Sequence, residues 1–140
     1  MIDNLQGTFL SNFYESMVQH EDMLYRNAES AFQASKCAVP EDRKIFQRLS
    51  GSNARRIGKI VTIREDWHDV RVDVMFQIVT AKFTQMPSLM EMLVATGDEE
   101  IVEGNYWNDK FWGKCNGEGM NHLGIILMTV RSVNTRREVK

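Results

Sequence analysis

Residues 66–84 read DWHDVRVDVMFQIVTAKFT and form the longest helical pattern in the sequence. Two apolar stripes run along this segment at spacings of three and four residues: Val70, Val74, Ile78 and Ala81 in one, Met75, Val79 and Phe83 in the other. An apolar surface this wide cannot face water, so the pattern predicts a central, largely buried helix. Asp66 is the predicted N-cap.

Shorter helices are predicted on both sides of this central one. Asn27 is a suitable N-cap and Glu29 falls in the first turn, so a helix is expected from there to about Ala38, before Pro40. Other helical patterns cover 41–49, 52–59, 87–95 and 121–133. Pro87 suits a first turn, and Gly97 suits a left-handed C-cap.

Extended structure is expected mainly near the N-terminus. Residues 8–13 have an extended pattern, and 17–25 alternate around the polar tip His20-Glu21-Asp22, as in a short hairpin. Residues 100–103 predict a short strand, and the Gly-, Asn- and aromatic-rich segment 104–119 predicts a loop that could wall a pocket. The expected fold is α+β and mainly helical, with a short N-terminal hairpin.

The chain has 140 residues, of which 43% are hydrophobic and 26% charged, as in ordinary globular proteins. It contains no repeat and no Pro/Gly/Ser-rich linker, so one compact domain over 1–140 is expected, with a core at about 8–133. No apolar run approaches a membrane span and no signal segment opens the chain, which favours a cytoplasmic protein without membrane contact. Cys37 and Cys115 are expected to be reduced thiols.

The net charge of −2 gives no global positive field for binding nucleic acid. Basic residues do cluster locally, so any nucleic acid would be contacted locally. The clusters contain Arg55, Arg56, Lys59 and Arg64, and Arg131, Arg136, Arg137 and Lys140. Solvated helix ends are the simpler interpretation, and phosphate binding is the alternative.

Several enzyme classes are excluded by motif. The sequence has no GxxxxGK[ST], GxSxG or HExxH motif, and no GxGxxG after a predicted strand. Cys115 and His122 are close in sequence, but a lone Cys/His pair rarely binds metal. We therefore predict no metal site.

Three features could carry chemistry. Glu29, Gln33 and Lys36 are spaced to share one helix face, as a catalytic array or as a solvent-facing polar stripe. Acids and indoles alternate over 103–113, where rings could stack on a base and an acid could stabilise a sugar cation, unless the rings only fill the core. Lys82 lies on an apolar stripe, where a lysine either snorkels to solvent or becomes a desolvated, reactive amine.

Taken together, these segments resemble the NADAR (YbiA-like) family, in order from one end of the chain to the other. The matching segments are 10–13 (LSNF), Glu29 with 32–36 (FQASK), 64–67 (REDW), 74–75, 82–83, 93–97 (LVATG), 102–103, Asp109 with 112–113, and 119–131. The resemblance implies a YbiA-like α+β domain that needs no metal or other cofactor. It also implies hydrolysis of an N-glycosidic bond.

The resemblance also indicates site residues. Those implied as catalytic are Glu29, Asp109 and Lys36; those implied to bind substrate are Asn12, Phe13, Gln33, Lys82, Glu103, Trp112, Gly113, Gly119 and Asn121. Either Glu29 or Asp109 would stabilise the ribose cation or polarise water, and Trp112 would wall the base or ribose. Lys36 or Lys82 would form a Schiff base or neutralise a phosphate, and backbone amides at 117–121 could also receive a phosphate.

Three functions remain open within this resemblance. The leading one is removal of ADP-ribose from ADP-ribosylated guanine, in nucleic acid or as a nucleotide; Ser30 and Ala31 beside Glu29 would widen the pocket for it. The second is cleavage of riboflavin-pathway ribosylamino-pyrimidine phosphates, which Met120 and His122 disfavour because relatives often carry basic residues there. The third is a non-catalytic module that binds ADP-ribose or a related NAD-derived signal. A purely structural protein fits the sequence least well.

Overall fold

The computed structural model describes residues 1–139, so Lys140 of the C-terminal basic cluster lies outside the described residues. The chain forms two compact units. The hairpin unit is Asn12–Met86, and the terminal unit combines Met1–Ser11 with the chain from Pro87 onward. Each is described by itself.

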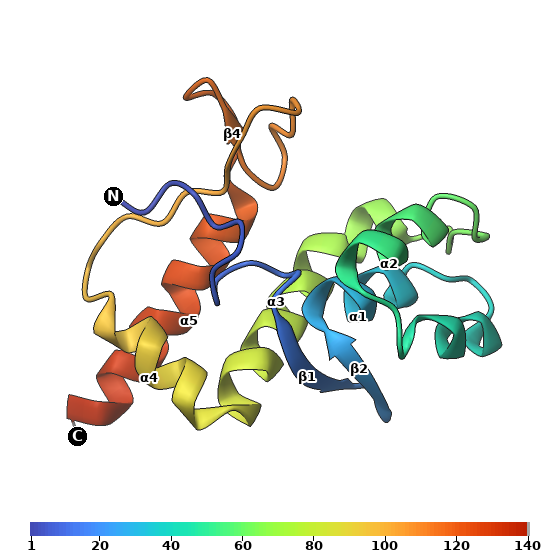
Figure 1. The fold of residues 1–140 in the computed structure, drawn as a ribbon, viewed down its shortest axis with the longest axis horizontal. Coiled ribbons are helices and arrows are strands. Elements are labelled where there is room, and N and C mark those ends of the chain that lie inside the picture. Colours follow the sequence, from blue (N-terminus) through green and yellow to red (C-terminus); the bar gives the residue numbers. More distant parts are fainter. Residues whose placement is uncertain (140) are drawn as a thin grey trace. The chain divides into compact units, whose positions relative to one another are not determined.

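The hairpin unit packs a two-stranded sheet and several helices around α3. Its elements are β1 (Glu15–His20), β2 (Met23–Asn27), α1 (Ala28–Ser35), the 3-10 helix η1 (Pro40–Phe46), α2 (Gly51–Ile57) and α3 (Trp67–Gln85). β1 and β2 are antiparallel, with Val18 opposite Tyr25 and His20 opposite Met23. β1 packs on α3 and β2 on α1 (Figure 1).

The predicted hairpin is confirmed. Its two turn residues, Glu21 and Asp22, have φ of 48° and 67°. Two successive positive φ values are typical of the tight turn whose twist matches the flanking strands. The predicted extended segment 8–13 is wrong, because these residues form consecutive turns, with Thr8 N–H donating to Leu5 O and Ser11 N–H to Thr8 O.

The central helix has the predicted character but not the predicted cap. Both stripes supply buried residues of α3, including Val74, Ile78, Val79 and Phe83. Asp66 stands at the N-cap position without making a side-chain cap bond. Its carboxylate instead accepts from Arg64 Nε at 2.6 Å and Nη2 at 2.9 Å, an ion pair that competes with the cap.

Two helical segments of the hairpin unit also differ from the predictions, and α5 (His122–Val139) of the terminal unit ends later than the predicted 133. The segment predicted as a helix at 41–49 is the 3-10 helix η1, which begins at Pro40 and ends at Phe46. α1 ends at Ser35 rather than near Ala38, because the chain there leaves the helix and pairs with 62–64: Ala38 N–H donates to Thr62 O and Arg64 N–H to Lys36 O.

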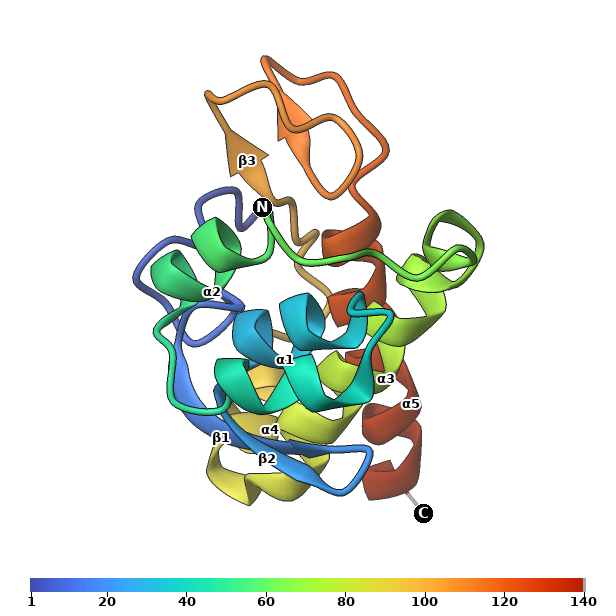
Figure 2. The same ribbon diagram turned by 90° about the vertical axis from the view of Figure 1, so that its right-hand side faces the viewer.

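The terminal unit packs α4 (Pro87–Ala95) against α5 (His122–Val139). Gly97 has φ of 68°, which confirms the predicted left-handed cap of α4. The short strands β3 (Gly104–Asn105) and β4 (Lys114–Cys115) are parallel and lie in the loop that leads into α5 (Figure 2).

Residues 100–103 are extended. Ile101 forms a bridge with Ile2, and the Ile2 N–H donates to Glu100 O at 2.8 Å. Within residues 1–139, none of the helices is long and apolar enough to cross a membrane.

Asn27 holds the junction between β2 and α1. Its Oδ1 accepts from Ser30 N–H at 2.8 Å, as the predicted N-cap, and its Nδ2 donates to Leu49 O at 3.0 Å. The Asn27 side chain is fully buried, so its own amide cannot exchange these bonds for bonds to water.

We expect Asn27→Ala to lower the free energy of unfolding by about 1–3 kcal/mol, since it removes a cap and also the hydrogen bond to the partly buried Leu49 carbonyl. Urea denaturation of both proteins measures this loss. The matched control is Asn53→Ala, because Asn53 is exposed and bonds only to Arg56 and Ser50. Equal losses in the two variants would show that the cap is not what stabilises this junction.

Candidate functional site

The predicted face of α1 contains a buried carboxylate bonded to an amide. Glu29 and Gln33 lie one turn apart, and Gln33 Nε2 donates to Glu29 Oε1 at 2.9 Å. Glu29 is only 8% exposed and Gln33 7%, so the alternative of a solvent-facing polar stripe is wrong for these two residues. The bond fixes one orientation of the carboxylate.

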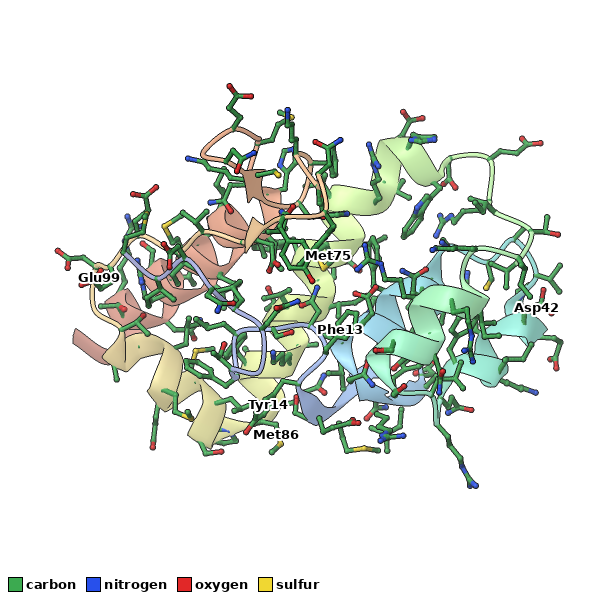
Figure 3. All side chains as sticks on the ribbon, turned by 45° about the horizontal axis from the view of Figure 1, so that its top comes forward. Phe13, Tyr14, Asp42, Met75, Met86 and Glu99 are labelled. Atoms are coloured by element: carbon green, nitrogen blue, oxygen red, sulfur yellow. The ribbon has the colours of Figure 1, made fainter. Side chains whose placement is uncertain are left out.

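Asn12 fixes the backbone on which Glu29 stands. The Glu29 N–H donates to Asn12 O at 2.9 Å, which satisfies one of the first-turn amides of α1. The Asn12 side chain is buried and its Nδ2 lies 3.3 Å from Sδ of Met75 on α3, a residue labelled in Figure 3. The next residue, Phe13, packs its ring on Gly51 at the start of α2, where a Cβ would meet Phe13 Cγ at 2.6 Å. Asn12 therefore acts on Glu29 through the backbone.

Gln33 is held on its other side by α2. Its Oε1 is buried, has no hydrogen-bond partner and lies against Gly58, the C-cap of α2. A Cβ at position 58 would collide with the Gln33 carboxamide and with Ala54 O, so only glycine allows this approach. Gln33 therefore lies where it can orient Glu29. The resemblance implied instead that Gln33 contacts the substrate.

Lys36 completes the α1 face at its C-terminal end. The side chain is half-buried, and burial lowers the pKa of its ammonium. Glu29 opposes this shift, and the nearby ammonium of Lys59 adds to it. The three predicted residues of α1 are therefore brought together on one face.

Lys82 lies inside the hairpin unit and does not snorkel. It is 1% exposed, and its Nζ lies 5.7 Å from the centre of the Tyr14 ring and 5.1 Å from that of Phe83. Figure 3 places Tyr14 in the segment that leads into β1. Desolvation by burial lowers the pKa of Lys82 to about 7, so a large share of this amine is neutral and nucleophilic at physiological pH.

The lowered pKa makes stability depend on pH. In the unfolded chain Lys82 keeps its proton up to about pH 10, whereas in the folded chain it loses the proton near pH 7. The free energy of unfolding therefore rises with pH between these two values, and Lys82 contributes no pH dependence below pH 7. We expect Lys82→Met to remove this rise, which amounts to at most about 1.4 kcal/mol per pH unit. Urea titrations from pH 6 to 10 measure it, with Lys44→Met as the exposed control. Parallel profiles for the parent and Lys82→Met would contradict the shift.

In the terminal unit, the Asn121 carboxamide connects two chain segments. Its Oδ1 accepts from Glu103 N–H at 2.9 Å and its Nδ2 donates to Ile101 O at 3.0 Å. Asn121 is 4% exposed, so its polar groups hold Glu103 in place. Gly113 lies directly against the Glu103 carbonyl, and Gly119, with φ of 146°, packs against Gly113 O and Lys110.

Asp109 organises the turn that carries Trp112. Its Oδ1 accepts from the N–H groups of Phe111 at 3.1 Å and of Trp112 at 2.9 Å. Asn105 was not among the residues predicted from the sequence. Its side chain makes two hydrogen bonds to the Asp109 backbone: Asn105 Oδ1 accepts from the Asp109 N–H, and Asn105 Nδ2 donates to the Asp109 carbonyl. The sequence signal that could have indicated this role is an asparagine four residues before an aspartate in a glycine-rich loop, since asparagine side chains often bond to the backbone of turns.

Trp112 belongs to a cluster of three rings. Its indole lies edge-on to Phe111 at 4.9 Å between centroids, and Phe111 lies 4.5 Å from His122. All three side chains are partly exposed. The rings therefore fill the loop and also present a surface on which a planar base could stack.

The structure bears on two sequence-based inferences about the substrate. Of the amides at 117–121, those of Glu118, Met120 and Asn121 donate to the carbonyls of Cys115, Lys110 and Gly113, so these three amides cannot receive a phosphate. Ser30 and Ala31 do not widen a pocket beside Glu29, because both are fully buried, and the Ser30 hydroxyl donates to Asn27 O.

The role of Asp109 can be separated from catalysis. Asp109→Asn keeps the oxygen that accepts the Phe111 and Trp112 amides, so we expect it to retain folding and turnover to within about threefold. Asp109→Ala removes that acceptor, so we expect it to lower both the melting temperature and the rate of turnover. Melting temperature and N-glycosidase assays on the two variants check this. A fold-intact Asp109→Asn protein with a loss of 100-fold or more would make Asp109 the catalytic acid.

No group of three or more His, Cys, Asp and Glu residues with a metal-binding arrangement occurs within residues 1–139. Cys37 and Cys115 are buried free thiols. Burial raises the pKa of Cys37, which leaves it a poor nucleophile at neutral pH.

The order of these segments matches a known family. Residues 3–133 match the NADAR domain family, a span that includes all twelve predicted site residues. The chain belongs to the NADAR family. This confirms the resemblance and the α+β, YbiA-like fold.

Similar proteins carry two kinds of name. The "N-glycosidase Npun_R5314" of Nostoc punctiforme is 34% identical, over 86% of this chain and 81% of its own length. The "Riboflavin biosynthesis protein VVA0006" of Vibrio vulnificus is 38% identical over 88% of this chain, which spans only 34% of that relative. The NMR structure of the E. coli protein YbiA has 30% identity and a TM-score of 0.85, over 99% of this chain and 88% of YbiA.

Proposed function

We propose that this chain is an N-glycosidase, a hydrolase that cleaves the bond between a ribose and a nitrogenous base. The observation that carries the proposal is the buried Glu29 carboxylate, fixed by Gln33 through its side chain and by Asn12 through its backbone. Departure of the base leaves positive charge at the anomeric carbon, which a fixed carboxylate stabilises. The N-glycosidase name of the Nostoc relative agrees with this proposal.

The proposed reaction is hydrolysis without a cofactor. The C–N bond breaks, the base leaves with the bonding electrons and takes up a proton, and the oxygen of a water molecule bonds to the anomeric carbon. Glu29 stabilises the cation or removes the proton from that water. In the same proposal, Lys82 is the amine able to form a Schiff base with an opened ribose.

ADP-ribosylated guanine is the substrate we propose, in nucleic acid or as a nucleotide. Met120 and His122 flank Asn121 without a permanent positive charge, and the neighbouring amides are bonded within the chain, so no monophosphate site is supported at the start of α5. A riboflavin-pathway ribosylamino-pyrimidine phosphate is the second candidate. The riboflavin biosynthesis name of the Vibrio relative favours it.

The first experiment offers the purified protein each substrate separately. Release of ADP-ribose from guanine-ADP-ribosylated DNA would support the leading substrate, and release of base from the pyrimidine alone would support the second. Tight binding of ADP-ribose without turnover of either substrate would replace the enzyme with a binding module. Inertness towards both substrates and ADP-ribose would reject the proposal.

Glu29→Gln tests the acid itself. The variant keeps an oxygen for Gln33 but loses the negative charge, so we expect kcat to fall by about 10²–10⁴ while the fold is kept. Steady-state kinetics and circular dichroism measure both effects. Glu41→Gln is the control, because Glu41 is exposed and pairs only with Lys44. A Glu29→Gln kcat within about threefold of the parent would exclude this role.

A further inference from the structure

The surface around α2 carries positive charge that is not neutralised within the chain. From Gly51 to Arg64 the sequence has four basic side chains and no acidic one. Arg64 binds Asp66 and Arg56 binds the Asn53 side chain. The side chains of Arg55 and Lys59 make no hydrogen bond or ion pair with any residue of the described chain.

Backbone pairing brings Lys36 of α1 to this surface. Residues 36–38 pair with 62–64, through Arg64 N–H to Lys36 O at 2.9 Å and Ala38 N–H to Thr62 O at 2.8 Å. One turn earlier, Gln33 lies against Gly58, the residue just before Lys59. These two contacts place Lys36 and Lys59 on neighbouring segments of the hairpin unit.

Lys36 and Lys59 are positive side chains without a bound carboxylate in the described chain. Lys36 is half-buried and has no ion-pair partner among the described residues. Burial is the largest cause of its lowered pKa; Glu29 and Cys37 oppose the shift, and Lys59 adds a smaller lowering. Of the two acids that follow this basic stretch, Asp66 is bound to Arg64 and Glu65 forms no ion pair with the described residues. A pair of neighbouring cations without a bound carboxylate is suited to an anionic ligand.

We propose that Lys36 and Lys59 together bind a phosphate group of the ribosylated substrate. The inference rests on the proposed function, because Glu29 lies on the same face of α1, seven residues from Lys36. That spacing is about 10 Å along a helix, which a ribosyl phosphate can span with its phosphate at the lysines and its anomeric carbon near Glu29. Lys36 then neutralises phosphate, and the amine left for covalent chemistry is Lys82.

Binding titrations on the whole chain test this site without depending on turnover. The probes are ADP-ribose, ribose 5-phosphate and ribose, and the variants are Lys59→Gln and Lys44→Gln. Lys44 is an exposed lysine of the same unit, paired with Glu41. We expect Lys59→Gln to weaken phosphate-probe binding by about tenfold or more, with a reduced dependence on salt, and Lys44→Gln to leave it unchanged.

The probes also distinguish the source of the phosphate. Equal losses for ADP-ribose and ribose 5-phosphate assign the site to a monophosphate at the ribose 5′ position, and a loss for ADP-ribose alone assigns it to the diphosphate. Failure of the parent to bind either probe, or affinities within twofold in Lys59→Gln, would overturn the inference. Phosphate binding through Lys59 in a parent that cleaves no N-glycosidic bond would retain this site and reject the proposed enzyme.

Discussion

The polar face of α1 depends on the buried carboxamide of Asn27. This side chain joins the last residue of β2 to the first turn of α1 and to the segment before α2, through Ser30 N–H and Leu49 O. It thereby fixes where the helix begins, and so which residues share the face of Glu29. Because α1 is short and its side chains are buried, a shift of its start by one residue would turn Glu29 away from Gln33 and Asn12.

The hairpin unit contains one carboxylate, Glu29, and two amines, Lys36 and Lys82, that are buried or half-buried. Stability alone does not favour the burial of these groups. Burying ionised groups costs free energy, and the lowered pKa values of Lys82 and Lys36 reflect that cost. The Gln33 amide donates to one oxygen of the Glu29 carboxylate and thereby orients it. Such an arrangement is typical of sites that stabilise charge in a reacting ligand.

Local signals predicted much of this architecture from the sequence. The hairpin, the Asn27 cap, the buried stripes of α3 and the left-handed Gly97 each follow from residue types within a few positions. The sequence did not indicate the partners of two polar side chains. Asp66 pairs with Arg64 instead of capping α3, and Asn121 bonds to the backbone at positions 101 and 103, about twenty residues away. Such partners are decided by tertiary structure, which spacing does not encode.

The candidate site shows the same division between local and tertiary information. The spacing of Glu29, Gln33 and Lys36 placed them on one helix face, but only packing distinguishes their roles. Gln33 packs against Gly58, the C-cap of α2, whereas the backbone pairing of 36–38 with 62–64 joins Lys36 to the segment that follows Lys59. One helix face thus carries an oriented carboxylate at one end and an unneutralised positive charge at the other. A ligand that is cationic at its reacting carbon and anionic at its phosphate complements both ends, and this polarity is the physical reason to favour a ribosyl phosphate over a neutral nucleoside.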